Sequence, residues 1–523
     1  MRVQKSCLRY LVPFSVGLGF EEACAQVDSW SAPVWQRVYS ESCQNHKGMD
    51  PGSSCESDLY SNVRNEFRWD EQTQPWQNKM GYTWQVQDAG PLLGRLRYVA
   101  EPEKLVAGEP YSYIEFDLTQ MELMLFCNGL GFVWYEVSIR KNVTAQELQE
   151  FQNHFKELNR GIFSCIWQVR KEEPALGLRC QKIVNGPQKH QIPAEYLTPF
   201  SMGHWLAKQL SFLQPVFLPD RANAYGSMMK KSLSEAVESM RIGDHKQVEQ
   251  MEGIPARVPD KAVLFTYAAF ETSSQPVSVS QEHRQLAYHL TNGYKEAYRY
   301  SCDLDQWMTN PFSNVLWYMS REGCGYLAWP DEKNKDFFCG LLAEKIRNDY
   351  FTLFIKGMFQ SYSLLLFDQK IQNRLSAVTE DYLVSKGNTV REGLMEEMER
   401  LICEINVFLA KSMETSVSHI DHQNRFYNEW IQRLRIHDEV RSVTAGLDAL
   451  EELQREQQKR EERQRDERLN FFLNVVAVLG AILTFSNLFE LLLEMMPTRE
   501  GAWAGLAVIA VAVWLVVRHM KKR

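Results

Sequence analysis

The sequence predicts an α+β cytosolic domain followed by long stalk helices and a two-helix transmembrane hairpin. Three observations predict this fold class. β-rich runs around glycine turns alternate with helix-like runs up to about residue 387, apolar residues then recur at helical spacing, and two long apolar stretches follow. We expect four segments: an irregular aromatic-rich segment (1–105), the α+β domain (106–387), a coiled-coil-like stalk (388–468) and a membrane domain (469–523).

The composition is that of a globular protein with an appended membrane segment. Of the 523 residues, 45% are hydrophobic and 24% are charged. The formal net charge of -8 offers no basic surface for non-specific nucleic-acid binding, so no nucleic-acid partner is expected. The 11 cysteines are odd in number and lack C-x2-C or C-x4-C spacing, which favours reduced thiols in a cytosolic compartment.

The amino terminus is expected to begin with a strand from Leu8 to Val16. The same run imitates a secretory signal peptide, because it has a basic start and an ACAQ sequence that resembles a cleavage site. Arg9 interrupts the apolar stretch, and Glu21 and Glu22 lie just before the cleavage site. These charges favour the strand over the signal peptide.

Two hairpin-plus-helix units are expected in the α+β domain. In the first, Asn128-Gly129 lies between β-rich runs and predicts a hairpin. Thr144 and Glu147 then predict a capping box at the start of a helix that ends at Gly161. The second unit runs from Asn314 to Trp329 and continues into a helix-like run. This similarity suggests a duplicated α+β unit.

Between the two units, Lys261 to Phe270 is expected to form a further strand. The turns of both units are candidate ligand-binding loops, because aromatic residues beside them could stack on a base. Their Gly-x-Gly pattern lacks the third glycine and the Lys-Ser of a phosphate-binding loop, so packing inside the hairpins is the alternative. The candidate residues are Gly129, Gly131, Tyr135, Gly323, Gly325 and Tyr326.

The stalk is predicted from apolar residues that step by three and four positions, such as Met398, Leu401 and Ile405. A polar break interrupts this pattern. It contains His419 and His422, whose spacing suits a metal pair on a helix, with a solvated hinge as the alternative. The segment from 454 to 468 contains no apolar residue, so a helix there is solvated or faces charged copies of itself.

The two expected spans are Leu469 to Leu493 and Gly501 to Val517. Cations gather before the first span and after the second, whereas the link between them carries only Arg499. The positive-inside rule therefore places both termini in the cytoplasm and the protein in the inner or plasma membrane, with the lipid bilayer as a partner.

One side of the first span is polar or small. Its members are Asn470, Asn474, Ala477, Ala481, Thr484 and Leu488. Two explanations compete: close packing against another helix, or a ring of first spans that lines a pore. The charged helix before the span favours the pore, with Arg463, Arg465 and Arg468 at its cytosolic mouth.

The stalk, the two spans, the short link and the basic tail make residues 390–523 resemble the CorA-like magnesium transporter superfamily. That family carries a Gly-Met-Asn motif after the first span, and this sequence has Phe485-Ser486-Asn487 and Glu494-Met495-Met496-Pro497 instead. The large, different amino-terminal part is more similar to divergent CorA-like membrane effectors of bacterial antiviral systems, including those beside type III CRISPR loci. This resemblance implies a membrane effector that a nucleotide second messenger opens.

We therefore expect a homo-oligomeric membrane channel, for example a pentamer, that is not an enzyme and is gated by a ligand bound to its cytosolic domain. The alternatives are a divalent-cation transporter of the magnesium type and a membrane-tethered cytosolic enzyme. No cofactor is expected, apart from a divalent cation as a permeant or regulatory ion.

Overall fold

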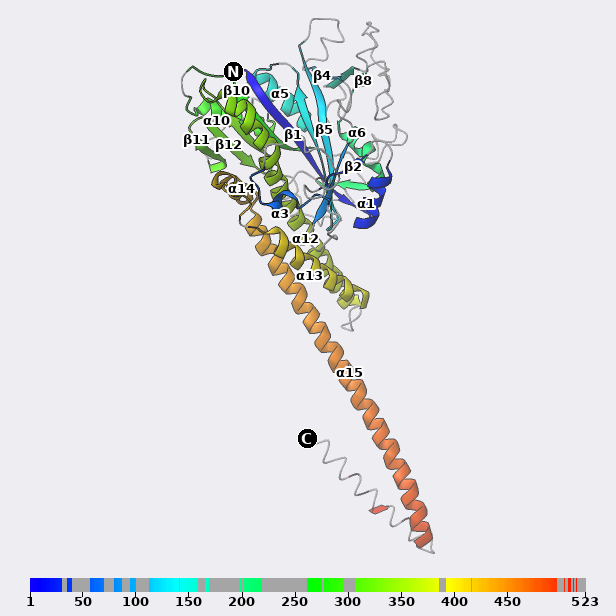
Figure 1. The fold of residues 1–523 in the computed structure, drawn as a ribbon. Helices are drawn as coiled ribbons and strands as arrows, with labels where there is room; N and C mark the ends of the chain where they lie inside the picture. Colours follow the sequence, from blue (N-terminus) through cyan, green and yellow to red (C-terminus); the bar gives the residue numbers. More distant parts are fainter. Residues whose placement is uncertain are drawn as a thin grey trace. The chain divides into compact units, whose positions relative to one another are not determined.

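The larger part of the chain is built around one 13-stranded sheet, which Figure 1 shows with its labelled strands. In chain order the strands are β1 (Val3–Val16), β2 (Trp35–Arg37), β3 (Gly81–Val86), β4 (Arg95–Val99), β5 (Tyr113–Phe126), β6 (Leu130–Ile139), β7 (Cys165–Gln168), β8 (Thr198–Pro199), β9 (Pro215–Phe217), β10 (Val263–Phe270), β11 (Met308–Phe312), β12 (Val315–Ser320) and β13 (Gly323–Ala328). Their order in the sheet is β11-β12-β13-β10-β1-β6-β5-β4-β7-β8, with β2 and β3 attached through β5, and β9 attached to β1. Among the described pairs, only β10 and β13 run parallel.

The helices follow the same numbering. They are α1 (Phe20–Ser29), α3 (Ser61–Arg64), α5 (Ala145–Lys156), α6 (Met202–Gln209), the 3-10 turn η2 (Ser211–Leu213), α10 (Gln281–Asn292), the π-helical turn η4 (Phe337–Leu341), α11 (Leu342–Lys345), the π-helical turn η5 (Ile346–Tyr350), α12 (Phe351–Val384), α13 (Glu392–Ser412), α14 (Asp421–Leu434) and α15 (Ile436–Met495). From η4 to α12 the chain is helical without a break.

This computed structural model describes residues 1–30, 35–39, 57–69, 80–86, 95–99, 112–140, 142–158, 165–168, 198–199, 202–218, 261–274, 277–294, 297, 306–384, 392–414, 416–495, 503, 507–508, 511 and 514. The chain divides into two units. Unit 1 comprises Met1–Asn373 and Glu399–Leu447, and unit 2 comprises Arg374–Met398 and Asp448–Arg523. The sheet lies entirely in unit 1.

The local signals around the first hairpin are confirmed. Asn128 and Gly129 connect β5 to β6, and Gly129 has a φ of +86°, a left-handed conformation that glycine adopts without strain. At the start of α5 the Thr144 hydroxyl accepts a bond from the Glu147 amide, and the Glu147 carboxylate accepts one from the Thr144 amide. The predicted stop at Gly161 lies outside the described residues.

The predicted strands at both ends of this region are also confirmed. The run predicted from Leu8 is part of β1, which pairs with β6 and with β10. The run predicted from Lys261 contains β10, whose side chains are buried throughout. The amino-terminal segment up to residue 105 contributes β1 to β4. Of these, β1, β3 and β4 pair with strands from the following segment, for example β3 with β5, and β2 pairs with β3.

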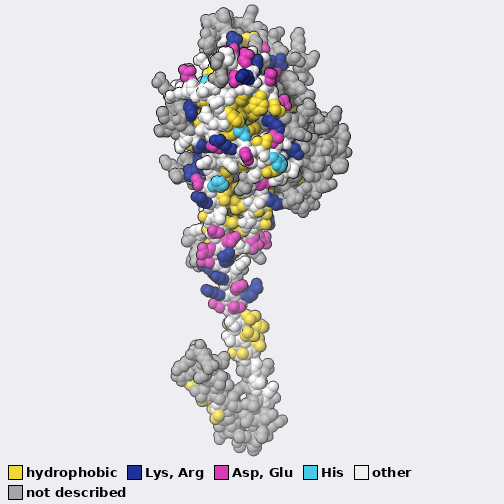
Figure 2. Space-filling view, turned by 60° about the vertical axis from the view of Figure 1, so that its left-hand side comes forward, with side chains coloured by type: hydrophobic (Ala, Val, Ile, Leu, Met, Phe, Trp, Pro, Cys, Tyr) yellow, Lys and Arg dark blue, Asp and Glu magenta, His cyan; other side chains and the backbone are white. Residues whose placement is uncertain are grey.

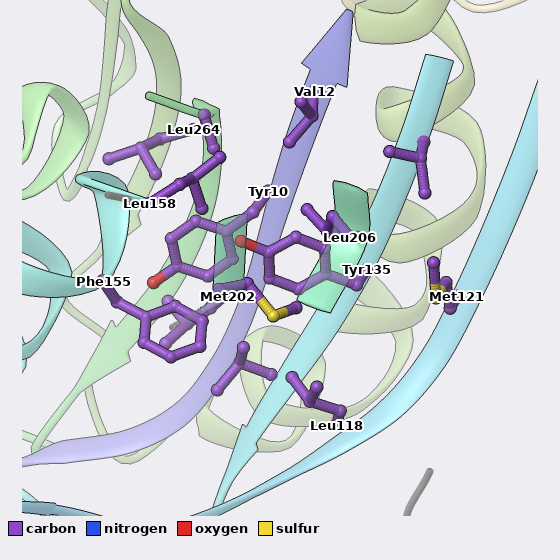
Figure 3. Close-up of a cluster of buried hydrophobic side chains, with 14 of the residues drawn as sticks. Tyr10, Val12, Leu118, Met121, Tyr135, Phe155, Leu158, Met202, Leu206 and Leu264 are labelled. Atoms are coloured by element: carbon purple, nitrogen blue, oxygen red, sulfur yellow. The ribbon is translucent and has the colours of Figure 1, made fainter. Parts of the chain in front are cut away.

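The two faces of β1 contact different helices, because side chains alternate along a strand. On one face the Tyr10 ring lies 5.1 Å from Phe155 of α5 and stacks on Tyr135 at 5.3 Å (Figure 3). On the other face the Arg9 guanidinium lies over the ring of Phe351, at the start of α12, at 4.2 Å. Helices thus cover both faces of the sheet. α5, which follows the hairpin of β5 and β6, packs on one face, and α12, which follows the hairpin of β12 and β13, packs on the other.

A buried ion pair stabilises the α12 side of the sheet. Arg9 on β1 and Glu136 on β6 are register partners, and their charged groups lie 2.7 Å apart. Arg347 of η5 adds a second cation, 2.9 Å from the same carboxylate. Burial raises the pKa of Glu136, but both arginines lower it, and the net shift is downward. This triad connects the turn η5 to the sheet.

Both predicted transmembrane helices are contradicted. Within the described part of the chain, no helix is both long and apolar enough to cross a membrane. The first predicted span, Leu469 to Leu493, belongs to α15, where the continuous run of described side chains ends at Gly480. Of the second span, Gly501 to Val517, only the helical positions 503, 507, 508, 511 and 514 are described.

The membrane domain, the two-span membrane localisation with cytoplasmic termini and the assignment as a transmembrane protein are therefore wrong. The apolar composition of Leu469 to Leu493 suggested a span, but the structure places this run at the end of a 60-residue helix. The preceding half of that helix carries ion pairs between residues four apart, such as Arg455 with Glu451.

Candidate functional site

A pocket of about 670 Å³ opens on unit 1. Its walls come from six places: the segment before α3, the connection between β11 and β12, strand β13, the turn between β13 and η4, the helical run from η4 to η5, and the start of α14. The lining residues are Asp58, Phe312, Ser313, Asn314, Tyr326, Asn334, Phe337, Phe338, Leu341, Leu342, Lys345, Tyr350, Ile420, His422 and Gln423. The volume is within the range of small-molecule sites, which are mostly apolar with a few polar groups.

The rim of this pocket carries exposed apolar side chains. Phe312 is 52% exposed, Phe337 47%, Leu341 52% and Ile420 41%. Among the described residues of unit 1, the one other large hydrophobic side chain that is exposed is Met1. Figure 2 shows hydrophobic side chains gathered on one face of the sheet-containing part, with histidines beside them. A monomeric surface rarely concentrates its exposed apolar groups in this way unless they contact a ligand or a partner.

Two π-helical turns position the long wall of the pocket. η4 supplies Phe337, Phe338 and Leu341, and η5 supplies Tyr350. A π turn contains more residues than an α turn, and such turns are frequent at functional sites. The Tyr267 hydroxyl of β10 donates a hydrogen bond of 2.5 Å to the Phe338 carbonyl. This bond connects η4 to the sheet.

The start of α14 supplies His422, and its side chain is fixed by aromatic neighbours. Its ring stacks on Phe312 at 5.0 Å and meets the edge of Trp317 at 4.8 Å. Nδ1 shares a hydrogen bond of 2.5 Å with the Tyr350 hydroxyl. Nε2 is buried and has no hydrogen-bond partner among the described residues.

The electrostatics of this pair favour neutral groups. Burial, and then the charge of Arg425, lower the pKa of His422 to about 4, so the ring is neutral at pH 7. Burial and the nearby phenol of Tyr326 raise the pKa of Tyr350, so its hydroxyl stays protonated. A general acid or base works best when its pKa lies near the working pH, and both groups are moved away from it.

The polar edge of the pocket is a lysine held by two carboxylates. Lys345 Nζ lies 2.7 Å from Asp58 Oδ2 and 3.7 Å from Asp349 Oδ2. Asp349 is 2% exposed and accepts hydrogen bonds from Ser57 Oγ at 2.7 Å and Gln423 Nε2 at 3.2 Å. The carboxylates thus hold Lys345 against the wall, and Gln423 attaches this cluster to α14.

Of the predicted ligand-binding turn residues, the structure places only Tyr326 at this pocket. The glycines occupy sites of close packing. A side chain at Gly131 would meet the Phe14 ring at 2.4 Å, and one at Gly325 would meet the Thr291 hydroxyl at 2.0 Å. Gly323 lies against the Thr291 carbonyl, Gly129 forms the hairpin turn, and Tyr135 is buried against Tyr10.

The two histidines of the predicted metal site contact different residues. His419 is exposed and its ring meets the edge of Tyr60 at 4.4 Å, whereas His422 bonds to Tyr350. In the portion of the chain that the structure describes, no three His, Cys, Asp or Glu side chains are arranged to hold a metal ion.

The predicted pore-lining residues lie on α15, in unit 2. Asn470, Asn474 and Ala477 are exposed, and Thr484 donates a hydrogen bond to the Gly480 carbonyl. The side chains of Ala481 and Leu488 lie outside the described residues. Arg463, Arg465 and Arg468 are exposed on the same helix. No contact among described side chains brings these groups together as a site.

Sequence reasoning missed the pocket. One signal was present: Phe337 and Leu341 are four residues apart, and so are Phe338 and Leu342. A helix with two adjacent apolar stripes can bury only one of them against a sheet, so the other requires a further contact. In the structure Phe338 and Leu342 are buried, whereas Phe337 and Leu341 remain exposed at the pocket.

Comparison with models of protein families, with curated proteins and with solved structures gives no match to this chain, so the resemblance to CorA-like proteins stays a prediction.

Proposed function

We propose that this protein binds a small, flat and largely apolar molecule in the pocket of unit 1. The observation that carries the proposal is the position of Phe312, Phe337, Leu341 and Ile420, which are exposed around a cavity of about 670 Å³. Covering each half-exposed side chain would contribute about 1 kcal/mol to binding. The cavity is lined by aromatic residues from different elements, such as Phe312 of β11 and Phe337 of η4, which favours a planar ligand.

The electrostatics of His422 and Tyr350 support a binding role for these two groups. The neutral His422 and the protonated Tyr350 are suited to hydrogen bonding, since neither changes its charge near pH 7. The predicted channel and the alternative cation transporter depended on the two membrane spans and are not carried forward. The protein is better described as a sensor or carrier whose ligand contacts η4, η5 and α14 together.

The test uses N-phenyl-1-naphthylamine, an uncharged aromatic dye whose fluorescence rises in apolar surroundings. Replacing Phe337 and Leu341 together with serine should weaken its binding by about 30-fold, because two apolar contacts worth about 1 kcal/mol each are lost. The matched control replaces Phe472 and Val476, also exposed and four residues apart, but on α15. This control should change the affinity less than about twofold.

Fluorescence titration of the full-length chain measures both affinities. Equal losses in the pocket variant and the α15 variant would mean that the dye binds exposed apolar surface in general. The proposal would then be wrong.

A further inference from the structure

The charge balance at the pocket edge points to a property of the ligand, and this inference rests on the proposed function. Among the pocket's lining residues Lys345 is the one Lys or Arg. Its ammonium is shared between Asp58 at 2.7 Å and Asp349 at 3.7 Å. One positive and two negative groups leave this edge with a formal charge of about -1.

Two arginines close in sequence to the pocket residues are themselves paired with carboxylates. Arg425 acts on the pKa of His422, but its side chain is 55% exposed and lies 4.0 Å from Glu429. Arg347 follows Lys345 by two residues, but it pairs with Glu136 in the sheet. An anionic ligand would therefore meet a lysine that is already neutralised.

We infer that Asp58 is a specificity-determining residue that makes the pocket select uncharged aromatic ligands over anionic ones. Its carboxylate lies at the pocket wall and its side chain is 30% exposed, whereas Asp349 is buried behind it. An anion that approached Lys345 would have to displace Asp58 or accept its repulsion. The predicted nucleotide signal carries phosphates, so this arrangement argues against a nucleotide at this pocket.

Substitution of the Asp58 side chain leaves the hydrogen bonds of its main chain in the pocket wall intact. Its backbone amide donates to Asp349 Oδ2 at 3.2 Å, and its carbonyl accepts from the Ser418 hydroxyl at 2.9 Å. Both bonds use the main chain and remain in Asp58→Asn. The substitution removes one negative charge while keeping nearly the same shape.

The experiment compares two dyes that share one aromatic skeleton. N-phenyl-1-naphthylamine is uncharged, and 1-anilinonaphthalene-8-sulfonate adds a sulfonate to it. The unchanged protein should bind the uncharged dye about 10-fold more tightly, and Asp58→Asn should strengthen sulfonate binding by about fivefold. Binding of the uncharged dye to Asp58→Asn should change less than about twofold, which also shows that the pocket is intact.

Two further variants complete the test. Asp438→Asn removes a carboxylate outside the pocket, one that pairs with Arg435 on the surface, so it should leave both dyes unaffected. Lys345→Gln removes the positive charge, so it should weaken sulfonate binding relative to the unchanged protein. This effect is opposite to the one expected for Asp58→Asn. The inference is overturned if the unchanged protein binds both dyes equally, or if Asp58→Asn and Asp438→Asn act alike. The proposed function itself fails if replacing Phe337 and Leu341 weakens binding of the uncharged dye no more than the α15 control does.

Discussion

Replacing Lys356 with methionine is expected to destabilise the protein by about 3–5 kcal/mol, because one partner of a buried ion pair is lost and the other stays buried. Lys356 of α12 is 0% exposed, and its Nζ lies 2.5 Å from Glu66 Oε2 and 3.3 Å from Glu414. Burial lowers the pKa of Lys356, but Glu66, Tyr427 and Glu414 raise it, and the net shift is upward. The lysine is therefore charged when buried.

Lys370, four turns further along α12, provides the matched control. Its Nζ lies 3.0 Å from Glu404, but the two side chains are 34% and 21% exposed. Lys370→Met should cost about 1 kcal/mol, since solvent screens a pair that is partly exposed. Urea unfolding followed by tryptophan fluorescence measures both variants. Similar unfolding midpoints for the two variants would show that the buried ion pair stabilises the protein no more than the exposed one. Adding Glu66→Gln to Lys356→Met should recover part of the lost stability.

Replacing Trp430 with alanine is expected to cost about 3–5 kcal/mol and to abolish dye binding at the pocket. Trp430 is fully buried on α14, stacks on Phe354 at 5.3 Å, and donates from Nε1 to the Phe354 carbonyl at 3.2 Å. α12 accommodates the indole with Gly357, where a side chain would meet it at 2.4 Å. A cavity here loosens α14, which carries His422 at its start.

Trp430→Phe is the control for this substitution. Phenylalanine keeps the ring stacking and loses the hydrogen bond, so it should cost about 1–2 kcal/mol and leave the dye affinity within about threefold. Thermal unfolding and dye titration give the two readouts. If alanine and phenylalanine lower the melting temperature equally, the packing of α14 on α12 does not depend on the indole.

Local signals in the sequence predicted local structure well. Asn128-Gly129 predicted the turn between β5 and β6, and Thr144 with Glu147 predicted the start of α5. These features depend on residues that are neighbours in the chain, because a turn or a cap closes within four residues. The apolar runs from Leu8 and from Lys261 likewise predicted β1 and β10.

The pocket could not be predicted because its residues are brought together by the fold. Asp58, Phe312, Lys345 and His422 are distant in the sequence and belong to different elements. Lys345 and Asp349 share a helix, but nothing local indicates that Asp58 joins them. The membrane prediction failed because it relied on the apolar composition of Leu469 to Leu493, whereas no described helix is long and apolar enough to cross a membrane.

The position of an apolar ligand in the pocket can be measured directly. 4-Fluorophenylalanine can be placed at Phe337, on the pocket rim, or at Phe472 of α15, and observed by ¹⁹F NMR during titration with N-phenyl-1-naphthylamine. We predict that the Phe337 signal shifts and saturates at about one dye per chain while the Phe472 signal stays in place. A shift at Phe472 with no change at Phe337 would contradict the assignment of the pocket as the binding site.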